Sequence, residues 1–160
     1  MTGDANTSIV VGIISDTHGL LRPQAIALLK GVDLIIHGGD VGTPAVLDAL
    51  RAIAPTTAVR GNVDTNAALS TLPETAVVKA GDVELYVLHN IADLRIDPAA
   101  AGYRAVIYGH SHRASMEERR GVLFLNPGAA GPRRFNLMPS IARAEVRGRE
   151  LTVAIQSLTE

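Results

Sequence analysis

Apolar residues in the first half of the chain fall in short runs that alternate with helical patterns. Residues 8–15, 32–37 and 56–59 are rich in branched aliphatic side chains or threonine, and each run leads into a polar, glycine-containing segment, as buried strands do. Between them, residues 23–30 and 44–53 repeat apolar side chains at helical spacing. The alternation of strand and helix predicts a parallel sheet with right-handed crossovers.

The second half is richer in strands. Residues 77–79 and 83–88 flank a glycine-containing turn, and residues 105–108 form another short apolar run. Two further hairpins are predicted to turn at residues 120–121 and at Gly148. A lone antiparallel sheet would leave one apolar face in water, so this half predicts a second sheet stacked on the first.

Length and composition indicate one soluble domain. The chain has 160 residues, and 47 % of them are hydrophobic but only 3 % aromatic, which suits a core of aliphatic strands and covering helices. We therefore expect residues 1–160 to form a single domain, with the polar residues 1–7 disordered. Neither a secretory signal nor an apolar run near the roughly 20 residues of a membrane span is present, so a cytoplasmic location is expected.

Charge and cysteine content narrow the chemistry. A formal net charge of -1 gives no strong signal for nucleic acid. Because the chain has no cysteine, disulfides and thiolate metal sites are excluded. Any bound metal must therefore be held by histidine, aspartate, asparagine or glutamate.

Residues that can bind a metal follow the predicted strands at their carboxyl ends. They are Asp16 and His18, Asp40, Asn62 and Asp64, His89, and His110 and His112. In an open α/β sheet these strand ends face one crevice, so the side chains are expected to converge there. In extended chain the members of an Asp-x-His or His-x-His pair point to one side, which predicts that each pair serves a single site. Such mixed oxygen and nitrogen donors suit manganese, iron or zinc rather than calcium.

These motifs resemble the signature of the calcineurin-like metallophosphoesterase superfamily. The matching segments are Asp16-Thr17-His18, Gly38-Gly39-Asp40, Gly61-Asn62-Val63-Asp64, His89 and Gly109-His110-Ser111-His112. The turn Asn126-Pro127-Gly128 narrows the resemblance to the small single-domain bacterial and archaeal phosphodiesterase branch. The resemblance implies an α/β fold in which two stacked mixed β-sheets are flanked by helices, a four-layer α-β-β-α sandwich.

The resemblance also implies a dinuclear metal centre. Its first ion would be held by Asp16, His18 and His112, and its second by Asn62, His89 and His110, with Asp40 bridging the two. The ions would be divalent, with manganese favoured and iron, zinc or nickel as alternatives. A hydroxide between them would be the nucleophile, with Asp40 and Asn62 as the catalytic ligands.

Several neighbouring residues have alternative interpretations. We interpret His37 as a structural residue or one that supports a ligand, and Asp64 as a residue that orients Asn62 or caps its loop rather than a ligand. Arg60 and Arg133, with the adjacent Arg134, could bind substrate phosphate oxygens, or they could be ordinary surface charges. Many relatives carry a histidine acid where this chain has Val63, and valine cannot donate a proton.

The leading functional hypothesis is hydrolysis of phosphate esters, with phosphodiesters favoured over monoesters. The substrate would be a small or nucleotide-like phosphodiester. The alternative is a catalytically inactive scaffold of the same fold that binds other proteins, as the retromer subunit of this superfamily illustrates. A complete ligand set favours the enzyme. The sequence leaves open the substrate, the native metal, the general acid and whether the chain forms a homo-oligomer.

Overall fold

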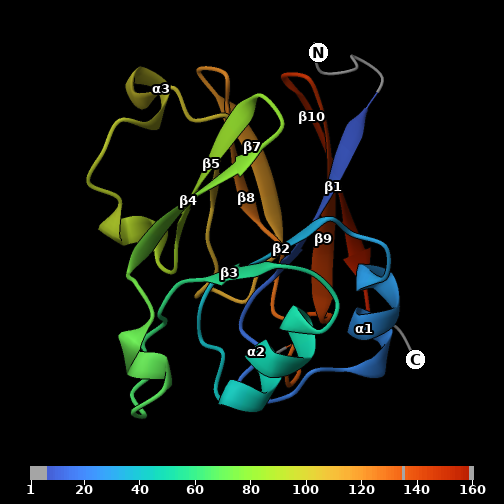
Figure 1. The fold of residues 1–160 in the computed structure, drawn as a ribbon. Helices are drawn as coiled ribbons and strands as arrows, with labels where there is room; N and C mark the ends of the chain where they lie inside the picture. Colours follow the sequence, from blue (N-terminus) through green and yellow to red (C-terminus); the bar gives the residue numbers. More distant parts are fainter. Residues whose placement is uncertain (1–6, 135, 159–160) are drawn as a thin grey trace.

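The computed structural model describes residues 7–134 and 136–158, which form two β-sheets with short helices (Figure 1). The predicted disordered start, residues 1–7, lies almost wholly outside these residues, and the single-domain organisation stays a prediction. In the first half of the chain the elements are β1 (Ser8–Ile14), α1 (Pro23–Leu29), β2 (Leu34–His37), α2 (Pro44–Arg51), β3 (Thr56–Ala58) and the 3-10 turn η1 (Leu69–Thr71). They are followed by β4 (Thr75–Ala80), β5 (Val83–Leu88), the 3-10 turn η2 (Ile91–Asp93), α3 (Pro98–Ala101), β6 (Ala105–Ile107), β7 (Ser115–Arg119), β8 (Val122–Asn126), β9 (Ser140–Arg147) and β10 (Glu150–Ser157).

The first sheet has the strand order β10-β9-β1-β2-β3. Strands β1, β2 and β3 are parallel, as the alternating pattern predicts, with Val11 opposite Leu34 and Ile35 opposite Thr56. The hairpin of β9 and β10 extends this sheet along the other side of β1, antiparallel to it. The expectation that all the late strands build the second sheet is therefore wrong for this hairpin.

The apolar character of β9 explains its place. Ala142, Ala144 and Val146 contact the core between the sheets, while Ile141 belongs to the core beneath the helices. The face with Ile141 otherwise carries the charged residues Arg143, Glu145 and Arg147, so β9 buries one apolar face and pairs with a neighbouring strand on each side. Strand β9 is thus flanked by β1 and β10.

The second sheet has the order β4-β5-β6-β8-β7. Strands β4 and β5 form the predicted hairpin, with Ala80 paired to Val83. Strands β5, β6 and β8 are parallel, and β7 returns antiparallel to β8. Both sheets are therefore mixed.

Three apolar clusters define four layers. The largest fills the space between the sheets and includes Ile13 and Leu85. A second lies between the first sheet and helices α1 and α2 and includes Ile14, Leu29 and Leu47. A third covers the outer face of the second sheet and joins it to η2 and α3. The fold is the predicted α-β-β-α sandwich, with α1 and α2 on one side and α3 on the other (Figure 1).

The layer arrangement places the chemistry-bearing loops together. Strands β1, β2 and β3 of the first sheet run parallel, as do β5 and β6 of the second, so within each sheet the loops that follow these strands leave at a common edge. Among the described residues, no helix is long and apolar enough to span a bilayer.

Candidate metal centre

The loops that carry the candidate ligands have an unusual backbone. Asp16, His18 and Asp40 have φ of 54°, 46° and 57°, and His110 and His112 have φ of 73° and 65°. Non-glycine residues rarely adopt this left-handed region, and such strain concentrates at functional sites. The expectation that each pair points to one side of an extended chain is therefore wrong for His110 and His112, which belong to different groups.

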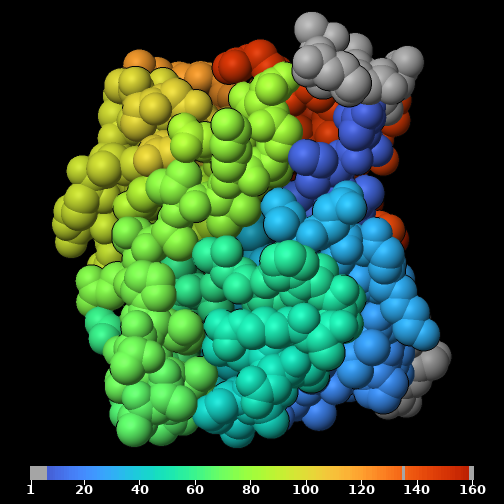
Figure 2. All heavy atoms as spheres, viewed as in Figure 1, coloured from blue at the N-terminus to red at the C-terminus, as the bar shows by residue number. Residues whose placement is uncertain are grey.

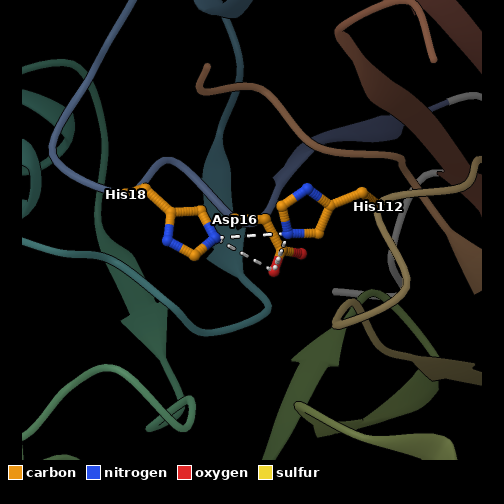
Figure 3. Close-up of side chains that lie close together, drawn as sticks. All are labelled: Asp16, His18 and His112. Atoms are coloured by element: carbon orange, nitrogen blue, oxygen red, sulfur yellow. Dashed lines mark hydrogen bonds and ion pairs between the residues drawn. The ribbon is translucent and has the colours of Figure 1, made fainter. Parts of the chain in front are cut away.

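The first group consists of Asp16, His18 and His112, whose side chains converge on one point (Figure 3). The Nε2 atoms of the two imidazoles lie 3.2 Å apart. Oδ1 of Asp16 lies 3.4 Å from Nε2 of His112 and 3.8 Å from that of His18. These atoms come from the loop after β1 and the loop after β6, so both sheets contribute.

The Asp16 carboxylate has two unlike oxygens. Oδ2 accepts hydrogen bonds from the Ser15 hydroxyl at 2.7 Å and from the backbone N–H of His110 at 3.1 Å. Oδ1 is buried and has no hydrogen-bond partner within the described part of the chain. A buried anionic oxygen without a partner is costly, and a cation between it and the two imidazoles would satisfy it.

The second group consists of Asp40, His89 and His110. His89 donates from Nδ1 to the carbonyl oxygen of Gly38 at 2.7 Å, which leaves the lone pair of Nε2 for a ligand. The side-chain oxygen of Asn62 lies 3.1 Å from that Nε2. His110 is exposed, so this group is open to solvent.

Asp40 lies between the two groups. Its Oδ2 is 3.2 Å from Nε2 of His89 in the second group and 3.7 Å from Nε2 of His18 in the first. Its Oδ1 accepts a hydrogen bond from the backbone N–H of Val63 at 2.9 Å. One carboxylate is thus placed to serve both groups.

The pKa shifts of three candidate ligands reflect their closeness to one another. Burial opposes the charge of Asp40, but hydrogen bonds from His89 and from the Val63 N–H outweigh it and hold the pKa of Asp40 below its ordinary value. Burial likewise lowers the pKa of His89, but its bonds to Asp40 and Gly38 outweigh burial, so its pKa is raised. Burial lowers the pKa of His18 and is only partly offset by Asp40 and Asp16. A metal must displace any proton on these nitrogens, so metal binding and protonation compete here.

His37 and Asp64 support the loops and are not part of either group. His37 is fully buried, its Nδ1 accepts from the N–H of Gly39 at 3.0 Å, and its Nε2 lies 3.0 Å from the Thr17 hydroxyl. That hydroxyl donates to the carbonyl of Val41, so His37 must be the donor to Thr17 and is neutral. Burial lowers the pKa of His37 to about 4.

Asp64 caps the loop around Asn62. Its carboxylate accepts hydrogen bonds from the backbone N–H groups of Gly61, Val41 and Gly42. Both side-chain oxygens are used, which agrees with the interpretation of Asp64 as a loop cap. The hydrogen bonds of both ring nitrogens of His37 likewise agree with its interpretation as a structural residue.

The arginines predicted to bind substrate are placed differently from one another. Arg60 lines a cavity beside the second group and pairs with Glu74 at 2.6 Å. Arg133 is exposed and does not line this cavity. The charge of its neighbour Arg134 acts on His18, whose pKa it lowers.

The supporting roles of two residues were not predicted, although one of them, Asn126, was named as part of a family turn. Asn126 is fully buried, donates to the carbonyl of Gly109 and the hydroxyl of Ser111, and accepts from the N–H of Gly128. It therefore clamps the loop that carries both His110 and His112. The Ser15 hydroxyl orients Asp16. The position of Asn126 directly after an apolar run was the one feature of the sequence that could have indicated this role.

Glycine is required where these loops approach each other. A Cβ at Gly61 would collide with the carboxylate and backbone nitrogen of Asp40, and a Cβ at Gly109 would collide with Ser15 and with the Asp16 carboxylate. The glycines that precede Asn62 and His110 thus let the ligand loops pack at backbone distance.

Comparison with known proteins agrees with this geometry. Residues 9–149 match the family model of the calcineurin-like phosphoesterase superfamily domain. The chain is 34 % identical over 137 residues to a probable metallophosphoesterase of Methanocaldococcus jannaschii, covering 76 % of this chain and 68 % of that protein.

Solved structures show the same architecture. Wild-type Vps29 of Entamoeba histolytica, complexed with zinc, superimposes with a TM-score of 0.78 at 27 % identity, covering 95 % of this chain and 94 % of that one. An archaeal phosphodiesterase superimposes with a TM-score of 0.77 at 25 % identity, covering 92 % of this chain and 100 % of that one.

Proposed function

The chain belongs to the calcineurin-like phosphoesterase superfamily, and from this premise we propose that it is a phosphodiesterase with two divalent metal ions. The first ion would be held by Asp16, His18 and His112, and the second by Asn62, His89 and His110. Asp40 would be shared. The observation that carries the proposal is Oδ1 of Asp16, which is buried, has no hydrogen-bond partner among residues 7–134 and 136–158, and faces imidazole nitrogens where the family motifs converge.

The donor set fits the proposed ions. Imidazole nitrogens with carboxylate and amide oxygens suit manganese, iron, nickel or zinc, and we favour manganese. When bound, the ions would supply activation of water and charge neutralisation at the phosphoryl oxygens. The zinc complex of the similar Vps29 supports metal binding at this fold.

The chain's own residues prepare the site for this chemistry. Ser15 and the N–H of His110 hold Asp16 so that its Oδ1 faces the first group. The Gly38 carbonyl holds His89 so that its Nε2 faces the second group. Asp40, fixed by the N–H of Val63, brings the two groups together. Such fixed placement lowers the cost of positioning reactants.

Hydrolysis forms one phosphorus–oxygen bond to a water oxygen and breaks one to the leaving alcohol, which takes up a proton. Val63 cannot supply that proton, although its side chain is 42 % exposed beside Asn62. The neutral His37 is fully buried and uses both ring nitrogens within the loops, so it cannot supply the proton either. Substrates whose leaving group needs little protonation are therefore favoured.

Preference for diesters is supported by the similarity to an archaeal phosphodiesterase. The test is to measure metal content of unstripped protein and then turnover of bis(p-nitrophenyl) phosphate against p-nitrophenyl phosphate with each candidate metal. We expect metal-dependent turnover that is faster on the diester. Equal or faster turnover of the monoester would contradict the diester preference, and absence of metal-dependent turnover would contradict the enzyme.

A protein-binding scaffold is the competing proposal, and the similarity to Vps29 favours it. The intact ligand set argues against it, because all seven candidate ligands lie in or beside the two groups. The turnover measurement separates the two proposals.

A further inference from the structure

Strand β10 forms an edge of the first sheet. It pairs with β9 along all eight of its residues, and within residues 7–134 and 136–158 it has no strand on its other side. In an antiparallel ladder alternate residues direct their N–H and C=O groups to opposite sides, so every second residue of β10 presents unpaired backbone groups. This edge is about 27 Å long. Figure 2 shows red atoms of the last hairpin at the surface, beside the blue atoms of β1.

The other three edge strands of the described sheets have features that discourage pairing with another chain. Strand β3 has only three residues, and β7 has three charged side chains among its five. Strand β4 carries Lys79 at an exposed position. Strand β10, in contrast, has eight residues, one charged side chain at its first position, and neither lysine nor proline. Natural proteins protect long edges with charge, proline or short length, so β10 is the unprotected edge of this molecule as described.

The core between the sheets is incompletely covered along this edge. Leu151, Val153 and Ile155 of β10 pack against that core but are only half-buried. On the other face of the strand, Thr152 and Ala154 are exposed. A partner along β10 would satisfy the backbone groups and cover the apolar side chains at the same time. The partner that suits this edge is therefore another strand with apolar residues on its inner face.

Strand β10 itself fits that description, because its pattern is the same in both directions about Val153. A two-fold axis at Val153 would pair β10 antiparallel with β10 of a second copy. Leu151 would then lie opposite Ile155 on the inner face. On the outer face, Thr152 would lie opposite Ala154. The one charged residue of the strand would lie opposite an amide side chain, so no like charges meet.

We propose that two copies of the chain pair through β10 and join their first sheets into one continuous sheet. The same surface serves both copies, as in most dimers with two-fold symmetry. Neither ligand group takes a residue from β9 or β10, and the cavity beside the second group takes none either. The pairing therefore uses no residue of the candidate metal centre, and the inference is independent of the proposed phosphodiesterase function.

Sedimentation velocity of the full chain over a dilution series tests the proposal. The parent should have twice the mass of the 16.8 kDa chain. In the double variant Thr152→Lys/Ala154→Lys, each new lysine would lie opposite a lysine of the other copy, and both positions are exposed in the single chain. We expect the dissociation constant of the dimer to rise by about 100-fold or more. Met116→Lys/Glu118→Gln on the exposed edge β7 makes the same change in net charge and, as the matched control, should stay dimeric.

A cross-link decides the question even if the lysine variant does not fold. The chain has no cysteine, so Val153→Cys introduces a single thiol, which would lie opposite its own copy. Opposite residues of antiparallel strands have Cα atoms about 4.5–5.5 Å apart, a separation that a disulfide can span. With diamide as oxidant, Val153→Cys should cross-link at least about tenfold faster than Met116→Cys on β7, because pairing holds its thiols together. A monomeric parent, a dimer that the two lysines leave intact, or equal cross-linking of the two cysteine variants would overturn the proposal.

Discussion

At the scale of single residues, the two oxygens of each carboxylate have separate tasks. Oδ2 of Asp16 and Oδ1 of Asp40 accept hydrogen bonds from backbone N–H groups, and the other oxygen of each faces imidazole nitrogens. Carboxylates held in this way keep their direction without a bound ligand. Replacing such a carboxylate with an amide therefore tests both tasks of the residue.

Asp40→Asn should weaken both metal sites, because the same side chain lies within 4 Å of ligands from each group. Loss of mere second-layer partners costs about 10- to 100-fold in metal affinity, so loss of this carboxylate should cost about 100-fold or more. Elemental analysis after dialysis checks the prediction, with the exposed Asp48→Asn on α2 as control. Full metal occupancy in Asp40→Asn would show that the carboxylate is not shared.

His37 should make stability depend on pH. The folded protein keeps it neutral with a pKa of about 4, whereas the unfolded chain takes up a proton below about 6.5. The unfolded state then binds more protons, so the stabilisation is complete above about pH 6.5 and is lost as the pH falls towards 4. The slope from one such group reaches about 1.4 kcal/mol per pH unit.

Urea unfolding of metal-free protein across this pH range measures the effect. His37→Gln should lower stability at all pH values and flatten the slope between about pH 6.5 and 4. Parallel curves for parent and variant would mean that other groups cause the pH dependence.

At the scale of elements, local patterns were predictable and pairing between distant segments was not. The runs around residues 8–15 and 32–37 became β1 and β2, because strand length and apolar content are local properties. The sequence did not indicate that β9 pairs with β1, since the partner of a strand depends on packing between segments that lie far apart in the chain. The placement of the loops at a common edge followed from the parallel strands, as predicted.

The sequence also did not show that His110 and His112 belong to different ligand groups. A two-residue spacing implies one direction in extended chain, but left-handed backbone at both residues turns them to different groups. Nothing in the identity of histidine signals that conformation. The loop needs an external support, and Asn126 at the end of β8 provides it.

Asn126→Asp should therefore disturb both groups from outside them. The substitution keeps size but replaces the donor to Gly109 and Ser111 with a second acceptor. We expect a loss of about 1–3 kcal/mol in the free energy of unfolding and reduced metal occupancy. Thermal unfolding and elemental analysis measure these, with Asn66→Asp as control, because Asn66 uses its oxygen to cap η1 and aspartate can do the same. Unchanged metal occupancy would limit Asn126 to a role in stability.

At the scale of the whole molecule, each candidate group draws ligands from both sheets. His18 and Asp40 follow strands of the first sheet, and His89, His110 and His112 follow strands of the second. Neither sheet carries a complete group, so a site exists only when the sheets are packed together. A cation that binds this arrangement must stabilise the packed state against the unfolded chain.

Metal should accordingly raise the melting temperature. At a free concentration of about 100 times Kd, one ion contributes about 2.7 kcal/mol, and a chain of this size gains about 2–4 °C per kcal/mol. A shift of roughly 5–10 °C is therefore expected with manganese or zinc after chelation. Calcium, which prefers oxygen ligands, should give a much smaller shift. Equal shifts with calcium would argue against a nitrogen-rich site.

The position of the two groups across the sheet interface makes them a sensor of the alignment of the two sheets. Leu85 lies in the core between the sheets and is not one of the candidate ligands, yet a substitution there that slides one sheet by about 1 Å would move His89 and His110 relative to Asp40. Metal affinity would then fall, although spectroscopic measures of secondary structure would not change. Substitutions in the core between the sheets are constrained in the same way. A core that is repacked without loss of stability can still misplace the metal ligands.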